Sequence, residues 1–406
     1  MTLKRVIKNT LLLGIALCVA SCDAVYDNRD NCVNGIQLKF RFDYHMERGA
    51  NAFASNVDCV DVYVFDNQGN YLTRFSESTS MLQNENYRMI LPLPEGDYRL
   101  MVYGGLSCEN PAFEIFKPWE EARSWDGFIG ASLASRGDSH SENIVVSLPH
   151  DNYVSKKQLH DKEARTGGLF YGFQYRRTDA LDNAWADCAK NPSGIMEVSV
   201  TNDDFGTSYT EYEVNMMKDT NDISVILQEL SAPYIVDYND FEFAIVDDNF
   251  HIDAYNVPIH VADENTTPTY LPHSTENRVI GYADGEGREG TLIEHDQSKP
   301  VQVGYVQFAT SRLHLSNYEN ARLVVKSHKE HDDDGSPSVI IDVPLIQYLS
   351  YTRGFGSNWI KSDQEYLDRQ SNWSLYFFLQ TGRWIRAKVA VNDWIVRVND
   401  IELGGM

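Results

Sequence analysis

The stretch Ile36–Phe42, with the sequence IQLKFRF, decides the fold of this chain. Its first, third, fifth and seventh residues are apolar, whereas the three residues between them are Gln, Lys and Arg. Successive side chains of a β-strand point to opposite faces, so this alternation predicts a strand with one buried and one solvated face.

Similar short segments follow along the rest of the chain, and polar turns separate them. Asp66–Asn70 is one such turn, and it predicts a hairpin between the strands on either side. Many short strands joined by polar turns predict an all-β fold built from antiparallel β-sandwiches, with short helices in loops. The predicted strands are Val60–Phe65, Tyr71–Phe75, Tyr87–Leu93, Tyr98–Tyr103, Ile144–Leu148, Ile195–Val200, Tyr212–Met216, Ile223–Leu227, Phe241–Val246, Tyr305–Phe308, Ala321–Lys326, Ser338–Val343, Trp373–Leu379, Ile385–Val391 and Trp394–Val398.

Helical patterns are few and short. Ser362–Glu365 has the sequence SDQE of a capping box, which predicts a helix that continues to Arg369. Pro118–Trp125 is a second candidate, with proline in its first turn. Glu330–Gly335 partly resembles a calcium-binding loop, but Ile341 stands where the bidentate glutamate should be. We therefore expect a polar hairpin tip there.

A weak internal repeat divides the chain. Val60–Asn67 and Phe241–Asp248 are both apolar strands with an acidic second residue and an acidic turn at the end. Each lies a similar distance after an alternating strand, which gives a repeat of about 180 residues. The repeat predicts two related sandwich domains in series. The alternative, that strands with polar turns simply resemble one another, stays open at this point.

The N-terminus has the features of a lipoprotein export signal. Residues 1–8 contain three basic residues and no acidic one, and an apolar run follows at Leu11–Ala20. At about ten residues this run is too short to span a bilayer, which needs about 20. Ala20 and Ser21 are small residues directly before Cys22, which is the pattern of a lipobox. We therefore predict cleavage before Cys22 and lipid on its sulfur; an ordinary secretory signal with a chance cysteine is the alternative.

These observations give a domain plan for the 406 residues, which exceed one average domain. Residues 1–21 are predicted to be the signal peptide and 22–34 a polar tether. Residues 35–207 and 208–406 are predicted to be the N-terminal and C-terminal β-sandwich domains.

The acidic composition limits the classes of partner. The formal net charge is −24, and it becomes more negative when the basic leader is removed. Nucleic acid is excluded as a partner, because phosphate binding requires a basic face. Four cysteines lie beyond the leader, and no CxxC pair occurs among them. Export makes disulfides possible, but the three pairings cannot be ranked, and unpaired cysteines in strands are equally compatible with the sequence. The four are Cys32, Cys59, Cys108 and Cys188.

Several segments partly match motifs of enzymes or cofactor-binding proteins, but each lacks a required residue or the expected flanking structure. Gly285–Gly290 matches G-x-G-x-x-G, but no helical pattern follows it. Gly130–Ala134 lacks the last glycine of a nucleophile elbow, and no H-E-x-x-H motif occurs. We therefore predict no catalytic residues, no cofactor and no metal site. Four tryptophans could form a platform that stacks on sugars, although core positions are the commoner role of tryptophan in strands: Trp359, Trp373, Trp384 and Trp394.

Five stretches, in this order behind the lipobox, resemble the FimB-type anchor subunits of type V fimbriae. The stretches are Ile36–Tyr44, Val60–Gly69, Pro94–Tyr98, Met216–Val225 and Gln364–Arg369. The resemblance implies two transthyretin-like β-sandwich domains and a structural role without enzymatic activity. It also implies a lipid anchor in the outer membrane, at the cell surface and the base of a fimbrium. The four cysteines of the mature chain do not match a family pattern.

The resemblance further implies that fimbrial shaft subunits are the partners, and that they bind by β-strand exchange. Ile36–Phe42 and Trp394–Val398 are the candidate strands for exchange, because both lie near chain ends; an ordinary core position is the alternative for each. In this interpretation the protein attaches the fimbria to the membrane and limits its length. The alternative function is that of a surface lipoprotein that binds glycans.

Overall fold

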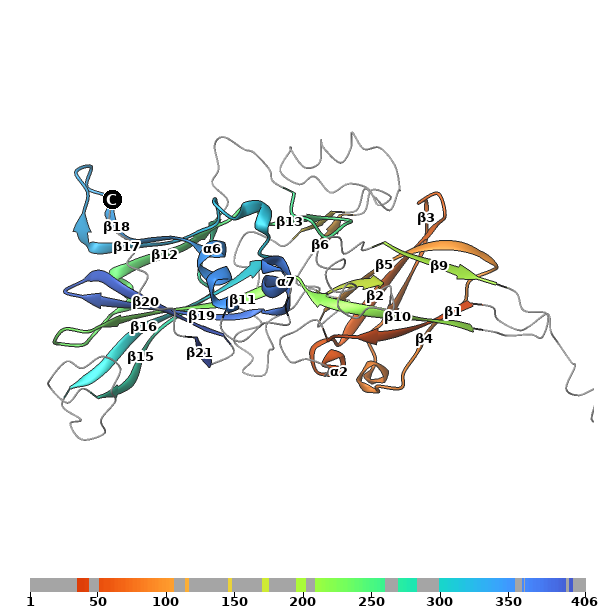
Figure 1. Cartoon of the computed structure of the whole chain (residues 1–406), viewed down its shortest axis with the longest axis horizontal. Coiled ribbons are helices and arrows are strands. Elements are labelled where there is room, and N and C mark those ends of the chain that lie inside the picture. The colour runs from red at the N-terminus through yellow and green to blue at the C-terminus, as the bar shows by residue number, and fades with distance from the viewer. Residues whose placement is uncertain are drawn as a thin grey trace, which may run out of the picture.

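The fold is described here from a computed structural model of the chain, shown in Figure 1. The signal peptide, Cys22, the tether, the candidate helix 118–125 and the glycine motif 285–290 lie outside the described residues. The structure describes residues 35–43, 51–105, 114–116, 145–147, 170–174, 195–201, 209–259, 269–282, 299–354, 360, 362–391 and 394–396.

An eight-stranded sheet forms the first half of the described fold. Its strand order is β3-β2-β5-β8-β10-β1-β4, and β9 pairs with β5. The helix α2 (Phe53–Asn56) and a 3-10 turn (Ser80–Gln83) lie between strands. The strands are β1 (Gly35–Arg41), β2 (Cys59–Asp66), β3 (Tyr71–Glu77), β4 (Met89–Leu91), β5 (Gly96–Gly105), β8 (Phe170–Gln174), β9 (Met196–Val200) and β10 (Tyr209–Lys218).

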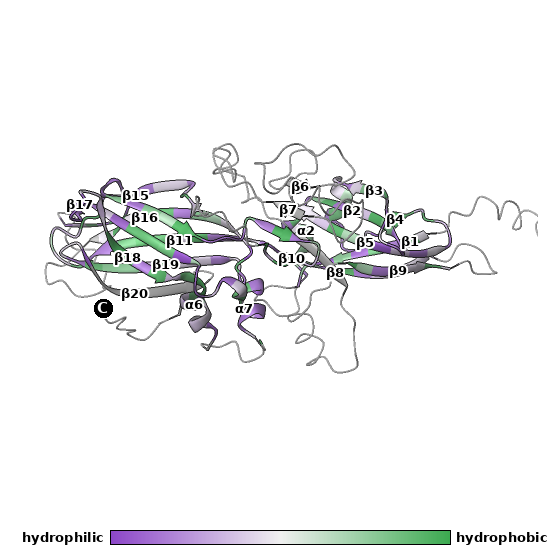
Figure 2. Cartoon of the chain, turned by 90° about the horizontal axis from the view of Figure 1, so that it is seen from above, coloured by the Kyte–Doolittle hydropathy of each residue, from purple (hydrophilic) through white to green (hydrophobic). Residues whose placement is uncertain are grey.

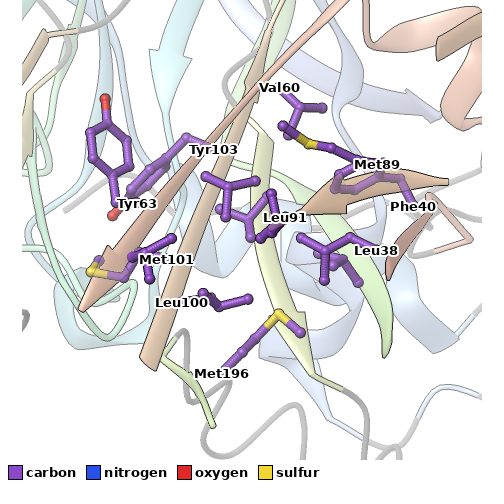
Figure 3. Packing of buried hydrophobic residues seen from close by; sticks show 14 of the residues in the cluster. Leu38, Phe40, Val60, Tyr63, Met89, Leu91, Leu100, Met101, Tyr103 and Met196 are labelled. Carbon is purple, nitrogen blue, oxygen red and sulfur yellow. The ribbon is translucent and has the colours of Figure 1, made fainter. Parts of the chain in front are cut away.

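Burial of alternate apolar residues forms this sheet, as the opening stretch predicts. Ile36 and Leu38 have no exposed surface, whereas the polar residues that alternate with the apolar ones along the strand are only half-buried. Together with Phe40 they belong to one buried cluster that also contains residues of β2 and β5, which we call the N-terminal core; Figure 3 shows Leu38 and Phe40 within it. Tyr63 and Tyr103 meet edge to face at 6.2 Å between ring centroids, a favoured geometry for aromatic pairs.

Two sheets packed face to face form the second half. The first sheet has the order β15-β16-β11-β19-β20-β21, and the second has the order β14-β12-β17-β18. Hydrophobic and hydrophilic stretches alternate along strands such as β11, β16 and β19 (Figure 2). The strands are β11 (Thr220–Glu229), β12 (Phe241–Val246), β14 (Thr269–Tyr270), β15 (Ser274–Tyr282), β16 (Pro300–Ser311), β17 (Arg322–His331), β18 (Pro337–Pro344), β19 (Asn372–Gln380), β20 (Arg383–Val391) and β21 (Trp394–Val396).

The apolar residues between these two sheets form the C-terminal core, which runs from Ile223 to Leu379. Two helices contribute to it, α6 (Leu345–Ser350) and α7 (Asp363–Arg369). Short 3-10 turns occur at Tyr238–Asp240, Leu315–Asn317 and Tyr351–Gly354. A small sheet of β6 (Glu114–Phe116), β7 (Val145–Ser147) and β13 (His251–Asp253) joins segments from both halves of the sequence.

The all-β prediction with short helices is confirmed, and most strand pairs are antiparallel. Two of the pairs between described strands are parallel. In the N-terminal sheet β1 pairs with β10, and in the C-terminal sheet β11 pairs with β19. In each half, the strand that opens the sheet in sequence therefore lies beside a strand that comes much later.

The predicted boundary at 207/208 divides the chain differently from the pairing of the strands. It assigns β10 to the C-terminal domain, but β10 pairs with β1 and β8 of the N-terminal sheet, and its Val214 and Met216 lie in the N-terminal core. The strand pairs there because its buried residues complete that core, which the local pattern cannot reveal. We propose Asp219, between β10 and β11, as the boundary.

Local signals for turns and caps agree with the structure. Asp66 closes the β2–β3 turn, because its Oδ1 accepts hydrogen bonds from the N–H groups of Gln68 (2.9 Å) and Asn70 (2.8 Å). Ser362 caps α7 by accepting from the N–H of Glu365 at 3.1 Å, as the capping box predicts. The predicted hairpin tip joins β17 to β18, with Gly335 at a φ of 83°. Among the described residues, no helix has both the length and the apolar composition needed to cross a membrane.

Candidate functional site at the junction of the two cores

A single residue links the two cores along the chain. Asp219 stands between the last residue of β10 and the first of β11, and it is 1% exposed. Its Oδ1 accepts a hydrogen bond of 3.0 Å from Nδ2 of Asn256, which is also buried. The linker is therefore held by side-chain contacts rather than by backbone pairing alone.

Arg312, just after β16, binds Asn256, which in turn binds Asp219 of the linker. Its Nε and Nη2 donate to the two carboxylate oxygens of Asp368 in α7, at 2.8 and 2.7 Å. Its Nη1 donates to the backbone carbonyl of Asn256. The side chains of the ion pair are 3% and 1% exposed. This bidentate contact fixes the orientation of the guanidinium group and the carboxylate, because both N–H groups must point at the two oxygens at once.

The loop after β13 brings the second half of the sequence onto the N-terminal core. Ala254, with no exposed surface, packs in that core, although the neighbouring chain leads into the C-terminal sheets. Asp253 shapes the loop by accepting from the N–H groups of Tyr255 and Val257, both at 2.9 Å. Asn256 adopts a φ of 63°, a conformation that asparagine tolerates better than most residues.

Helix α7 contacts both halves. Nε2 of Gln364 donates to Asp368 (2.8 Å) and to the carbonyl of Leu313 (3.1 Å). Arg369 donates through Nε to Glu365 at 2.9 Å, and through Nη1 to the carbonyl of Asp43, just beyond β1, at 3.2 Å. Both side-chain pairs are four residues apart, so the cap that sets the start of α7 also sets their alignment.

We call Asp219, Asn256, Arg312, Asp368, Gln364 and Arg369 the junction network. Its polar groups mainly bind one another and the backbone, and all six residues are buried. Such an arrangement restrains the relative movement of two β-structures. Within the described part of the chain, no group of three or more His, Cys, Asp or Glu side chains is placed to hold a metal ion.

Burial dominates the electrostatics at the linker. It raises the pKa of Asp219 to about 7, against the lowering effects of Arg312 and of the Asn256 hydrogen bond, while Asp368 adds a smaller upward contribution. The carboxyl group of Asp219 therefore binds its proton more tightly in the folded chain than in the unfolded one.

The substitution Asp219→Asn tests how much the ionised carboxyl group of Asp219 lowers the stability of the folded chain. The folded pKa is raised, so the carboxyl group costs stability as pH rises from its unfolded value near 4 to about 7. We expect the variant to gain stability relative to the parent over that range, by an amount on the order of a few kcal/mol at pH 8. Urea denaturation at several pH values measures the difference. A difference that stays constant from pH 4 to 8 would contradict this account.

The cysteines and tryptophans named in the sequence analysis lie in different parts of the chain, and the structure describes only some of them. Cys59 is buried and disulfide-bonded. The predicted lipid site Cys22 and the other cysteines lie outside the described residues. Trp373 lies in the C-terminal core and is 1% exposed, which excludes it from a sugar platform. The other three tryptophan side chains are outside the described set.

The two candidate exchange strands differ in position. The strand at Ile36–Phe42 corresponds to β1, which pairs with β10 on one side and with β4 on the other. It is therefore an interior strand. This agrees with the alternative stated above, in which the segment is an ordinary core strand and not an exchanged one. The strand near the C-terminus corresponds to β21, which ends the path of its sheet beside β20.

Sequence reasoning missed the junction network. Its α7 residues carried a signal in the capping box, and Asp219 and the α7 residues lie in two stretches that support the family resemblance, Met216–Val225 and Gln364–Arg369. Arg312 and Asn256 lie in loops, and their partners are distant in sequence. No local pattern identifies them.

Comparisons with known proteins agree on one family. The family model of the fimbrillin-A associated anchor proteins Mfa1 and Mfa2 matches residues 29–161 and 193–400. A candidate adhesin from Bacteroides thetaiotaomicron is 30% identical, with a TM-score of 0.64 over 91% of this chain and 99% of that chain. A candidate polysaccharide-binding protein from the same species is 25% identical, with a TM-score of 0.60 over 90% and 99%.

The fimbrial anchor protein Mfa2 from Porphyromonas gingivalis is 14% identical and has a TM-score of 0.52 over 89% of this chain and 98% of that chain, which is a likeness of fold. No curated protein sequence matches the chain at a significant level.

Proposed function

The chain belongs to the Mfa2 family of fimbrillin-A associated anchor proteins, and from that premise we propose that it attaches a fimbria to the outer membrane through lipid on Cys22. The observation that carries this proposal is the family match over most of the chain, together with the lipobox before Cys22. Its partners are fimbrial shaft subunits, its place is the cell surface at the base of the fimbria, and its attachment limits fimbrial length.

The architecture suits an anchor in two respects. Shaft subunits that bind by strand exchange need a sheet edge, because an added strand gains its affinity from main-chain hydrogen bonds along that edge. The strand β21 ends the path of the six-stranded sheet and is our candidate for this contact, in place of β1. The junction network lets the two cores carry load between the lipid and the fimbria as one body.

Deleting the gene tests the anchor function. We expect fimbriae to be released into the medium, often overlong, while shaft subunits are still made. Electron microscopy of cells and culture supernatants, with immunoblots for the shaft subunit, measures both outcomes. Fimbriae that remain attached and of normal length in the deletion strain would contradict the proposal.

The substitution Cys22→Ala tests the lipid anchor separately. Without the sulfur nucleophile, no acyl chain is attached, so the protein is expected to remain uncleaved or to leave the membrane fraction. Each buried CH₂ of an acyl chain contributes about 0.8 kcal/mol to membrane binding, so two or three chains hold a protein firmly. Mass spectrometry of the mature N-terminus decides the matter, and Cys18→Ala is the matched control. An unmodified N-terminus at another residue of the parent protein would exclude lipidation at Cys22.

Binding of glycans is the second candidate, and the relative with a polysaccharide-binding description supports it. Burial of Trp373 removes one member of the sugar platform considered from the sequence. A glycan array with the purified mature chain separates the two functions, because an anchor needs no sugar ligand.

A further inference from the structure

The strand that follows the tether is held mainly by one long parallel ladder. β1 pairs with β10 over seven register pairs, from Gly35↔Tyr209 to Arg41↔Asn215. On its other side β1 has only three register pairs, to β4. The contact with β10 therefore provides most of the main-chain pairing that keeps β1 in place.

The partner strand leads directly into the other core. β10 ends at Lys218, Asp219 follows, and β11 begins at Thr220. β11 is paired on both sides, with β16 and with β19, inside the six-stranded sheet. In Figure 1, β10 and β11 follow one another toward the C-terminal half. A pull on the C-terminal half therefore reaches β10 at its C-terminal end.

The direction of the ladder determines how that pull acts. Because β1 and β10 are parallel, Gly35 and Tyr209 lie at the same end of the ladder. A chain held before Gly35 pulls β1 toward that end, whereas the C-terminal half pulls β10 toward the opposite end. The two strands are then drawn past each other along their length, and all seven register pairs carry the load together.

We propose that the β1–β10 pair is a shear-loaded mechanical clamp, which bears the tension between a membrane-held N-terminus and whatever pulls on the C-terminal half. The physiological load rests on the proposed function, but the clamp itself is a property of the folded chain. Strands that are pulled apart sideways lose their pairs one at a time, whereas sheared strands must lose them together.

Side chains reinforce the clamp. Ile36, Leu38 and Phe40 are buried in the N-terminal core, so sliding of β1 must drag them out of packed positions. At the far end of the strand, Arg369 donates to the carbonyl of Asp43. The ion pair of Lys39 with Glu213, at 3.6 Å, is partly exposed and adds little.

Single-molecule force spectroscopy on the purified mature chain, with Cys22 replaced by a ligation tag, tests the clamp. In one arrangement the chain is pulled from this tag and from the C-terminus, which shears the ladder. In the other it is pulled from the same tag and from a ligation peptide inserted at 204/205, next to Tyr209, which opens the ladder from one end. We expect the force that releases β1 to be several-fold higher in the first arrangement; equal forces would overturn the proposal.

A disulfide staple provides the second measurement. Gln37 and Glu211 are register partners, and neighbouring strands lie about 4.8 Å apart, within the range a disulfide bridges. In end-to-end pulling, the pair Gln37→Cys with Glu211→Cys should raise the first unfolding force, and reduction should bring it to the value of the parent measured under the same reducing conditions. The control pair, Val324→Cys with Asp342→Cys, joins register partners of β17 and β18 away from this path.

An unchanged first unfolding force in the Gln37/Glu211 variant, or an equal rise in the control, would overturn the clamp. These measurements use no fimbria, so failure of the clamp and failure of the anchor function can be told apart.

Discussion

Replacing Arg312 with Met is expected to lower the free energy of unfolding by about 3–5 kcal/mol, the usual cost of leaving one partner of a buried ion pair alone. The Asp368 carboxylate, 1% exposed, would lose both of its guanidinium hydrogen bonds. Gln364 would remain as a donor to Asp368, but it carries no charge. Equilibrium denaturation followed by tryptophan fluorescence and circular dichroism measures the loss.

The double variant Arg312→Met with Asp368→Leu is the matched control. It removes both charges, so most of the lost stability should return, because no carboxylate is then left buried without its partner. Arg312→Lys keeps the charge but loses the bidentate geometry, so its free energy of unfolding should lie between those of the parent and Arg312→Met. A single Arg312→Met variant as stable as the parent would show that the junction network contributes little to stability.

Trp373→Ala is expected to be the most damaging change in the C-terminal core, at about 3–5 kcal/mol. The indole ring is 1% exposed and meets Tyr366 edge to face at 5.6 Å between ring centroids. Its Nε1 donates to Oδ1 of Asn221, the buried second residue of β11, at 3.2 Å. The substitution therefore creates a cavity and also removes a donor from a buried amide.

Trp373→Phe separates these two effects, because it keeps most of the ring volume and loses the donor. It should cost less than Trp373→Ala. Thermal unfolding and chemical denaturation measure both variants. A loss for Trp373→Ala below about 1 kcal/mol, as is usual for exposed positions, would contradict the buried placement of the ring.

Period-two patterning predicted most of the strands, and its failures have a physical cause. Strands with one buried face, such as β1 and β19, carry the alternation and were predicted within a few residues. β15 was missed, because its first five residues, STENR, are all polar. β15 ends its sheet path beside β16, and such a strand can form with few buried side chains because its neighbour supplies the pairing.

Local sequence patterns could not predict which strands pair or which polar side chains meet, because both depend on residues that are distant in sequence. The alternation in Tyr212–Met216 indicated a strand, but not that this strand pairs with β1 rather than with the strands that follow it. The junction network depends on the same kind of information. Arg312 is one arginine at the end of an apolar strand, and only the folded chain places it between Asn256 and Asp368.

The pairing of β1 with β10 also constrains how the molecule is made. Gly35 leaves the ribosome long before Tyr209, its partner in the ladder, and synthesis at about 5–20 residues per second makes that interval on the order of ten seconds or more. During this time β1 has no partner strand on its β10 side. Contacts between distant residues also form slowly, because a long loop must close first.

The N-terminal half of the nascent chain is therefore expected to stay open until β10 has emerged. That delay favours passage across a membrane in an unfolded state, and it makes the early chain a substrate for chaperones that cover apolar strands such as Ile36–Phe42.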